Sequence, residues 1–597
     1  IDQVRLCSGV REFRPLRAEM TSTRAVFLRM EKASVALAVT NLRAEPLGKA
    51  RATLSLEGHA EQAVPLEGLG GGQTRQIDYA LDTSLRPGEY ELRVRVDLGD
   101  EPPLEEALRV RIVGRPCGGE FPVVMWGGYS PESLVQEMGR LKRIGFTHVL
   151  GLGADSTRIW EAGKVVQAGS DETVGKTRWA LDEALANGVR LAASLSPASR
   201  FRGQDRFARI GPDGKPNNEA VCAAFGELEG FCYNVGASMA RTYGDHPAFA
   251  AALLHTEVRD HARPCYHPHD LEALHKATGL DKPLPGAGRW GADYARLKDF
   301  PADRVVPDDH PVLAFSRWYW SEGDGWNRLN TALHRGLKST GRRDLWTWHD
   351  PAVRVPSLYG SGGEADVISQ WTYSYPDPIR IGLATDELLA MAGGAGSPQQ
   401  VMKMTQVIWY RSQTAPQAKD GRIPATAADW EREQPDAPFI TIAPMHLREA
   451  LWTKIARPIR GIMYHGWQSL VPCDGHSSYR CTNLQTQDEL ARLVREVIRP
   501  LGPTLLKVPA ARSDVAFLES FASQMLARRG TWGWGGSWAG DAWHVLAWAR
   551  LQSEIVYDQT IARRGLDGYR VLVACDCDVL SQTAARRIGE FQQRGGL

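Results

Sequence analysis

The sequence predicts a multidomain protein made of an all-β sandwich, a (β/α)8 barrel and a smaller α/β domain. Its 597 residues are too many for one hydrophobic core. Residues 1–113 alternate polar and apolar positions between turn residues, which is typical of antiparallel sheets. From residue 118 onward, apolar strands alternate with amphipathic helices, which is typical of parallel sheets. The architecture therefore changes near Gly114-Arg115-Pro116.

The composition is that of a globular protein and argues against several classes of partner. Hydrophobic residues make up 43% and charged residues 24% of the chain. A formal net charge of +1 argues against nucleic acid as the main partner. No apolar run approaches the ~20 residues that a membrane span needs. Nine cysteines without a CxxC pair give no zinc signature, so we expect no metal and no cofactor.

The first residue bears on where the protein acts. No signal peptide is visible, and the chain begins at Ile1 rather than Met, which allows for a removed leader or a trimmed sequence. A periplasmic or secreted location is slightly favoured over a cytoplasmic one.

Residues 1–113 are expected to form an immunoglobulin-like sandwich. Residues 34–39 and 90–96 read as half-buried strands, and Gly70-Gly71-Gly72 and Pro87-Gly88 supply turns between them. The expected role is a structural cap or spacer, and carbohydrate binding is the alternative.

Residues 118–500 are expected to form the barrel, and residues 508–597 the last domain. Gly145 and Gly188 end the first two helices of the barrel. Eight apolar segments read as its strands: 123–126, 147–150, 189–193, 248–256, 344–348, 365–370, 400–406 and 459–465.

The apolar run 250–256 leads directly to Glu257. A run of that length reads as a strand buried on both faces, and such strands deliver side chains to the carboxyl rim of the barrel, where these folds keep their reactive groups. Glu257 is therefore a candidate catalytic residue. The alternative is a strand-end Glu that pairs with Arg259 or is solvated.

Several short motifs carry a family resemblance. They include Trp126, residues 145–149, Pro212-Asp213-Gly214, Asp245-His246-Pro247 and His255-Thr256-Glu257. With residues 365–369, Tyr375-Pro376 and residues 462–467, they resemble the clan A glycoside hydrolases, especially the family 42 β-galactosidases. Residues 514–518 and 568–574 are similar to the flavodoxin-like domain through which that family trimerises. The resemblance implies an exo-acting glycosidase that binds a carbohydrate substrate and forms a homo-oligomer, either a trimer or a dimer.

The resemblance assigns Glu257 as the acid/base but leaves the second carboxylate open. The family has its nucleophile, a Glu, at the end of the seventh strand, whereas residues 401–410 contain no carboxylate. We expect Asp350, beside His349, to serve instead, unless it only caps the segment before Pro351. Asp155 is the second choice, and a loop cap is its commoner role. The remaining candidates are Asp377 and Asp474.

The absence of a carboxylate from the seventh strand favours an inverting mechanism, because acids on the other strands are expected to lie farther from Glu257. Two alternatives remain open. One is a glycan-binding relative without catalysis, and the other is a retaining enzyme whose nucleophile lies elsewhere.

Aromatic and polar side chains gather near the predicted strand ends. Sugar rings stack on aromatic planes, and polar neighbours bind the hydroxyl groups. Arg259, Arg354 and Arg411 could hold an anionic sugar, although structural ion pairs are the commoner role of single arginines. The expected substrate-binding residues are Trp126, His255, His349, Trp371, Tyr375, Gln406, Trp409, His465 and Trp467.

The tail begins with a predicted linker at residues 500–512. Ser581 is expected to cap a helix that carries Ile588 and Phe591 and ends at Gly595-Gly596. An α/β domain would continue with a strand beginning near Leu597, so we expect this domain to extend beyond the sequence.

Overall fold

The computed structural model describes residues 15–597 with several gaps. Residues 58, 60, 100, 117, 259–262, 285–290, 351–360, 371–377, 395–397, 411–437, 473–478 and 528–537 are outside the description. The chain divides into two units, residues 1–117 with 175–188, and residues 118–174 with 189–597.

Two β-sheets form the N-terminal unit. One contains β1 (Leu16–Met20), β3 (Ala33–Asn41) and β6 (Thr74–Leu81), and the other contains β2 (Val26–Leu28), β8 (Leu104–Val113), β7 (Gly88–Asp97), β4 (Arg51–Leu56) and β5 (Gln62–Pro65). All strand pairs are antiparallel except β2 with β8. In β6, Ile77, Tyr79 and Leu81 are buried and the residues between them are exposed. This alternation gives both sheets one shared apolar core.

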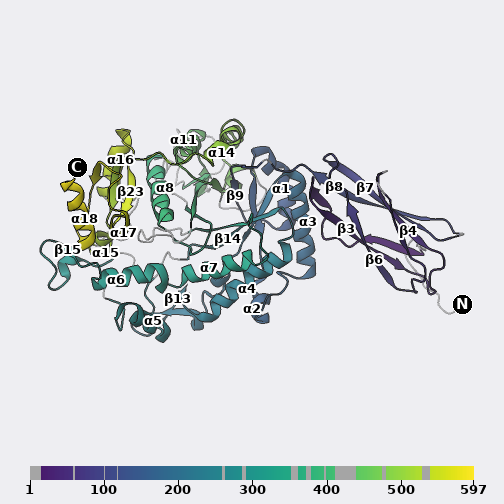
Figure 1. Cartoon of the computed structure of the whole chain (residues 1–597), viewed down its shortest axis with the longest axis horizontal. Coiled ribbons are helices and arrows are strands. Elements are labelled where there is room, and N and C mark those ends of the chain that lie inside the picture. Colours follow the sequence, from purple (N-terminus) through teal and green to yellow (C-terminus); the bar gives the residue numbers. More distant parts are fainter. Residues whose placement is uncertain are drawn as a thin grey trace, which may run out of the picture. The chain divides into compact units, whose positions relative to one another are not determined.

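Eight parallel strands close into a barrel, as the sequence predicts (Figure 1). The order around the barrel follows the chain, and β21 pairs with β9 to close it. Every strand lies within two residues of its predicted position. The strands are β9 (Val123–Trp126), β10 (His148–Leu152), β11 (Arg190–Ser194), β14 (Phe249–Thr256), β16 (Trp346–Asp350), β17 (Val367–Gln370), β18 (Gln400–Gln406) and β21 (Gly461–His465).

The helices between the strands follow the sequence signals. Helix α1 (Pro131–Ile144) is capped by Ser130 and ends at Gly145 with φ 105°, a left-handed conformation that glycine adopts without strain. Helices α4 (Gly226–Tyr243) and α7 (Trp326–Lys338) pack backbone to backbone. A Cβ atom on Gly236 would lie 2.3 Å from the carbonyl oxygen of Leu333, so glycine is required for this approach. The close packing holds α7 against β14, which leads to Glu257.

Side chains fill the inside of the barrel. The inward positions form one apolar cluster: Val124, Leu150, Ala192, Ala251, Leu253, Trp346, Trp348, Val367, Met402, Met404 and Met463. The barrel is therefore a packed core with no channel through it, and only its carboxyl rim is left for chemistry.

Three insertions extend the carboxyl side of the barrel. Strands β12 (Ala208–Ile210) and β13 (Pro216–Val221) form a hairpin. Helix α5 (Pro268–Thr278) follows β14, and α6 (Pro311–Trp318) continues into a wide turn, η4 (Tyr319–Gly323). A second hairpin, β19 (Ile408–Tyr410) with β20 (Phe439–Thr441), follows β18.

The C-terminal segment contains a three-stranded parallel sheet. The strand order is β23 (Glu554–Tyr557), β22 (Val515–Glu519) and β24 (Val571–Val573). As predicted, Ser581 caps α18 (Gln582–Gln593), in which Phe591 is buried. Leu597 exchanges backbone hydrogen bonds with Arg570 and Leu572, beside β24. Leu597 therefore lies alongside β24.

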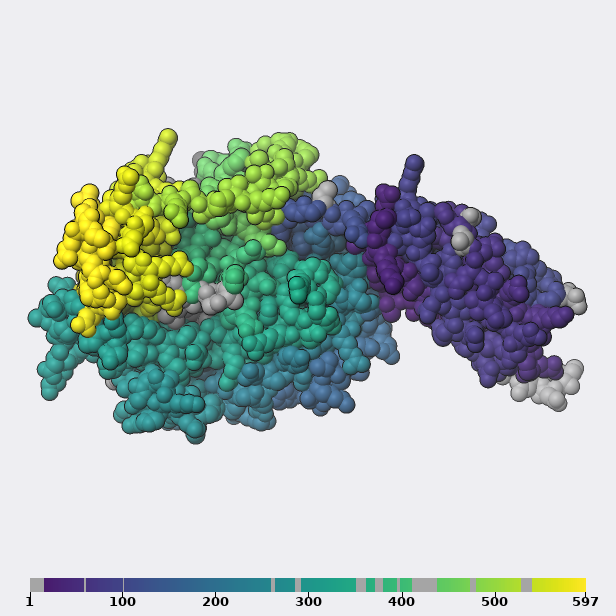
Figure 2. Space-filling model, in the orientation of Figure 1, coloured from purple at the N-terminus to yellow at the C-terminus, as the bar shows by residue number. Residues whose placement is uncertain are grey.

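The C-terminal segment lies against the barrel insertions. Strand β25 (Leu580–Ser581) pairs in parallel with β15 (Val305–Val306), and the backbone N–H of Thr583 donates to Asp308 at 3.3 Å. Figure 2 shows the yellow C-terminal residues beside a teal part of the chain, as this strand pair requires. No helix in the described ranges is long and apolar enough to cross a membrane.

The predicted linker is partly wrong. Residues 500–505 belong to helix α14 (Arg499–Leu505), which continues from α13 (Leu484–Leu493) through a π-type turn, η6 (Val494–Ile498). Pro500 falls just after this turn, and a π-type turn relaxes the hydrogen-bond ladder that proline would otherwise interrupt. The irregular connection begins only after Leu505.

Candidate active site

The carboxyl rim of the barrel collects polar side chains from several strands. Residues two apart on a strand share a face. The residue two positions after the last inward residue of the apolar cluster on each strand therefore also points inward, at the carboxyl rim. On this count Asp350 follows Trp348, Gln406 follows Met404 and His465 follows Met463. Trp126 packs directly on the apolar cluster. Four of the predicted site residues therefore share this layer.

Glu257 directly follows β14, as predicted, and it is exposed. Its φ is 54°, in the left-handed region that a residue with a Cβ atom seldom adopts. Ser196, which follows the neighbouring strand β11, also has a positive φ of 41°, and its hydroxyl accepts from the N–H of Thr256 at 3.3 Å. Backbone strain of this kind clusters at functional sites, so these adjacent strand ends are candidates for one.

Asp350 is the last residue of β16 and is fully buried. Strands β14 and β16 are hydrogen-bonded neighbours, and Thr256 is the register partner of Asp350. The two predicted catalytic carboxylates therefore come from adjacent strand ends, as the sequence suggested.

A group of aromatic rings lies on the same rim as Glu257. Tyr479 stacks on Phe439 at 5.0 Å, and its ring meets that of His465 edge to face at 5.7 Å. Phe439 in turn contacts Tyr410 at 5.1 Å. Burial raises the pKa of Tyr479, and the nearby Tyr410 and Glu257 raise it further. The effect of Glu257 on this pKa indicates that Tyr479 lies near Glu257.

Several polar atoms of the rim layer are buried and have no hydrogen-bond partner among the described residues. They are the Thr256 hydroxyl, the Ser369 hydroxyl and Nδ1 of His465. Burial also lowers the pKa of His465, so its ring is neutral at pH 7. Buried polar groups are normally hydrogen-bonded, and water or the hydroxyl groups of a ligand can supply partners for these three.

His255 and His349 form hydrogen bonds that connect β14 with α7 and β16. Strand β14 has a register shift between Leu253 and Thr256, which turns His255 away from the inward face. Nδ1 of His255 donates to Asn330 on α7 at 2.8 Å, and the ring packs on Trp326. His349 donates from Nδ1 to the carbonyl of His255 at 2.9 Å. Both histidines thus brace the strand that leads to Glu257.

Asp155, Trp409 and Trp467 each make contacts with other parts of the protein. Asp155 is exposed and caps α2 (Ser156–Ala162) by accepting from the N–H of Arg158 at 3.0 Å. Trp467 is only 4% exposed and packs on Phe146 and Tyr129. Trp409 contacts His446 at 4.9 Å.

Some predicted site residues lie outside the described residues. These are Trp371 and Tyr375, together with Asp377, Asp474, Arg259, Arg354 and Arg411.

The sequence analysis missed two features of the site. Phe439 and Tyr479 come from segments far apart in the chain, and only the fold joins them to His465. The second feature is a set of possible metal ligands, Cys222, Cys265, His267 and Asp270, whose ligand atoms all lie within 4.8 Å of one another. The spacing Cys-x-His-x2-Asp is visible in the sequence, but only the fold brings Cys222 to these residues.

Comparison with known proteins supports the fold. No protein-family model matches the sequence, and no curated protein matches it. A polyextremophilic β-galactosidase from the haloarchaeon Halorubrum lacusprofundi aligns with 78% of this chain and 71% of its own, with a TM-score of 0.51 and 14% identity. A GH5_18 protein from Bifidobacterium longum aligns with 76% of this chain and 97% of its own, with a TM-score of 0.42 and 13% identity. The chain thus shares its fold with the β-galactosidase.

Proposed function

We propose that this protein is a glycoside hydrolase in which Glu257 is the general acid and Asp350 the second carboxylate. Cleavage of a glycosidic bond needs an acid to protonate the leaving oxygen and a carboxylate to act on water or on the anomeric carbon. The observation that carries the proposal is the register of β14 and β16, in which Thr256 faces Asp350. Neighbouring strands lie about 4.8 Å apart, so the two carboxyl groups can reach the separations of roughly 5–9.5 Å that hydrolysis uses.

The two carboxylates occupy environments that suit different roles. Glu257 is exposed beyond its strand, where it can approach the oxygen of a leaving group, whereas Asp350 is buried at its strand end. We propose that Asp350 activates a water molecule on the opposite face of the sugar, which is an inverting mechanism. The aromatic group of Tyr410, Phe439 and Tyr479 would stack on sugar rings beside Glu257.

Substrate and domain roles complete the proposal. An oligosaccharide or glycan with an accessible end suits an exo-acting enzyme, as the likeness to a β-galactosidase also suggests.

The N-terminal sandwich would be immunoglobulin-like. The C-terminal segment would be flavodoxin-like, because its first strand β22 lies between the second, β23, and the third, β24.

The test is hydrolysis of a panel of aryl glycosides and oligosaccharides. Glu257→Gln is expected to bind sugar normally and to lose about 10²–10⁴-fold in turnover, the usual scale of general acid catalysis. Asp350→Asn is expected to lose at least as much. Glu161→Gln, an exposed carboxylate in α2, is the matched control and should retain its activity. Unchanged turnover in Glu257→Gln would remove Glu257 from the mechanism.

Proton NMR of the first product tests the stereochemistry. An inverting enzyme releases the anomer opposite to that of the substrate. A product with the configuration of the substrate would exclude inversion and would direct the search to a nucleophile elsewhere.

A glycan-binding protein without catalysis is the second candidate. It is favoured by one observation, that β18 ends in Gln406 and carries no carboxylate. Under this alternative the wild-type protein binds oligosaccharides and releases no sugar from any of them.

A further inference from the structure

A pocket of ≈ 520 Å³ lies among the insertions on the carboxyl side of the barrel. Small-molecule sites occupy volumes of roughly 300–1,000 Å³, so this pocket is large enough for one. Helix α5, the turn η4 and the first turns of α7 supply most of its lining residues. None of the described rim residues around Glu257 and Asp350 is among them. The pocket is therefore distinct from the candidate active site.

Helix α7 separates the pocket from the candidate active site. Its buried residues Trp326 and Asn330 face β14, where the ring of His255 lies 5.3 Å from Trp326 and Nδ1 lies 2.8 Å from Asn330. Asn327 and Thr331 lie four residues apart, so they share another face of the helix, and they line the pocket. Because α7 leads into β16, its first turns lie at the carboxyl end of the barrel. The two sites are thus on the same end of the barrel.

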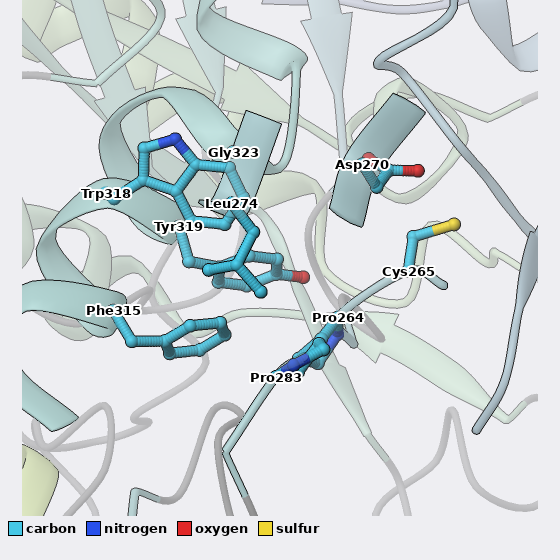
Figure 3. Close-up of a pocket in the computed structure, with 9 residues that line it drawn as sticks. All are labelled: Pro264, Cys265, Asp270, Leu274, Pro283, Phe315, Trp318, Tyr319 and Gly323. Atoms are coloured by element: carbon cyan, nitrogen blue, oxygen red, sulfur yellow. The ribbon is translucent and has the colours of Figure 1, made fainter. Parts of the chain in front are cut away.

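Trp318 gives the pocket a fixed aromatic plane. A Cβ atom on Gly323 would lie 2.8 Å from three neighbouring carbons of the six-membered ring, and equal distances place it over the face of the ring. Only glycine therefore lets this face rest on η4. Figure 3 shows the ring beside Gly323, at a smaller pocket that shares both residues and Asp270 with the larger one. Trp318 remains partly exposed, and such planes stack on the C–H faces of sugars.

The backbone around the pocket is held in place by side-chain and glycine contacts. Nδ2 of Asn327 donates to the carbonyl of Ser321 at 2.7 Å, and Oδ1 accepts from the N–H of Gly362 at 2.9 Å. Gly325 has a φ of 81°, and a Cβ atom there would lie 2.5 Å from the carbonyl carbon of Ala223. The turn η4 is therefore tied both to α7 and to the segment after β13. A site that is ordered before binding loses less entropy when a ligand arrives.

The charged groups of the pocket favour a neutral, polar ligand. Glu322 is exposed, and nothing in the described parts of the chain bonds to its carboxylate. Nη2 of Arg328 donates to the carbonyl of Ala224 at 2.7 Å, and Nε lies 3.4 Å from Glu229, which leaves other N–H groups for a ligand. The carboxylate repels anions such as phosphate, and the guanidinium group repels cations. Sugar hydroxyl groups carry no charge and both donate and accept, so they can bond to both side chains.

We propose that this pocket is a second carbohydrate site, which holds one neutral sugar residue against Trp318 and bonds its hydroxyl groups through Glu322 and Arg328. The choice of a sugar rests on the proposed function, whereas the pocket itself does not. Binding forms no covalent bond. A long glycan held here stays attached to the protein, so that the arrival of its end at Glu257 becomes an intramolecular step.

Fluorine NMR of protein labelled with 5-fluorotryptophan tests the proposal. The Glu257→Gln variant serves as the background, so that no sugar is hydrolysed during the titration. The resonance of Trp318 is identified by its loss in Trp318→Phe. Methyl β-galactoside, methyl β-glucoside and methyl β-mannoside are the probes, and at least one of them is expected to shift this resonance in a saturable manner.

A second substitution connects the shift to the pocket. Glu322→Gln is expected to weaken the binding measured at Trp318 by about tenfold or more, since hydrogen bonds to charged groups are strong. Glu272→Gln removes an exposed carboxylate of α5 that does not line the pocket, so it should leave this affinity unchanged. Trp452 on α11 (Pro444–Ile455) is 48% exposed, and its resonance should not move with any of the three sugars.

Three results would overturn the second site. One is a Trp318 resonance that moves with none of the sugars. Another is an unchanged affinity in Glu322→Gln, which would mean that the shift is transmitted from elsewhere. The third is a shift caused by inorganic phosphate alone, which would exclude a sugar as the ligand.

The second site and the proposed function can fail separately. A wild-type protein that hydrolyses glycosides without any shift at Trp318 would remove the second site and leave the hydrolase. A saturable shift at Trp318 in a protein that releases no sugar would retain the second site and favour the glycan-binding alternative.

Discussion

His255 lies at the register shift of β14, and its burial makes the stability of the protein depend on pH. Burial lowers its pKa to about 4, while its hydrogen bond to Asn330 acts in the opposite direction. In an unfolded chain the pKa of histidine is about 6.5, so the unfolded state takes up the proton first as the pH falls. His255 should therefore contribute stability above pH ~6.5 that is lost as the pH falls through 4, by about 3 kcal/mol at ~1.4 kcal/mol per pKa unit.

The direction of this pH dependence of stability can be measured by thermal melting between pH 7 and 4. His255→Gln is expected to melt at a lower temperature than the wild type at pH 7, but its melting temperature should fall less on acidification. His275→Gln, an exposed histidine in α5, should follow the wild-type curve. Parallel curves for His255→Gln and the wild type would rule out the assigned contribution.

Glu257 is one of the non-glycine residues whose left-handed backbone conformation opposes stability. A side chain in the left-handed region costs roughly 1–2 kcal/mol, and glycine avoids that cost. Glu257→Gly is therefore expected to melt no lower than the wild type while losing turnover, since it also removes the proposed acid. Glu137→Gly, in the middle of α1, should lower the melting temperature. A strongly destabilised Glu257→Gly would show that its side chain supports the fold rather than the chemistry.

At the scale of elements, the two candidates for the second carboxylate have different positions: Asp350 ends β16, and Asp155 precedes α2. Asp155 caps α2, and loss of an N-cap typically costs about 1 kcal/mol. Asp155→Ala is therefore expected to lower the melting temperature slightly and to leave turnover within about threefold of the wild type, in contrast to Asp350→Asn. A loss of turnover of 10²-fold or more in Asp155→Ala would make Asp155 the base instead.

The strands were predictable because their signals are local. Apolar runs such as that of β14 and glycine stops such as Gly145 depend on the sequence within a few residues. The orientation of His255 was not predictable, because the register shift in β14 reverses the alternation that the sequence implies. The helix at Pro500 was not predicted, because the π-type turn before it has no local sequence signature.

The parts of the site that the sequence did not reveal are non-local. Phe439 bridges to Tyr479, and Cys222 meets Cys265, only after the insertions have folded over the barrel. Glu257 and Asp350 could be placed because each ends a strand, and consecutive strands of a barrel are neighbours. Residues within regular elements are thus predictable from the sequence, whereas contacts between insertions depend on the tertiary fold.

At the scale of the whole molecule, the C-terminal segment is joined to the barrel by specific contacts. The β15–β25 pair and the bond from Thr583 to Asp308 connect it to the insertion before α6. The guanidinium group of Arg457, which follows α11 (Pro444–Ile455), lies over the ring of Trp543 on α16 (Trp538–Trp548) at 5.9 Å. On the same helix Val545 and Trp548 are exposed.

An exposed apolar patch on α16 and the residues after it leads to the last prediction. Val545 and Trp548 are 61% and 71% exposed and lie three apart, on one face of α16. Leu551, just after the helix, is 51% exposed. Exposed apolar clusters of this kind mark contact surfaces, so we expect the protein to form a homo-oligomer through this segment. Light scattering should give two or three times the mass of the chain. Trp548→Glu should reduce the measured mass to that of a single chain. Trp179→Glu, an exposed tryptophan on α3 (Asp171–Asn187), is the matched control and should leave the oligomer intact. A wild-type protein that is monomeric at micromolar concentration would contradict this expectation.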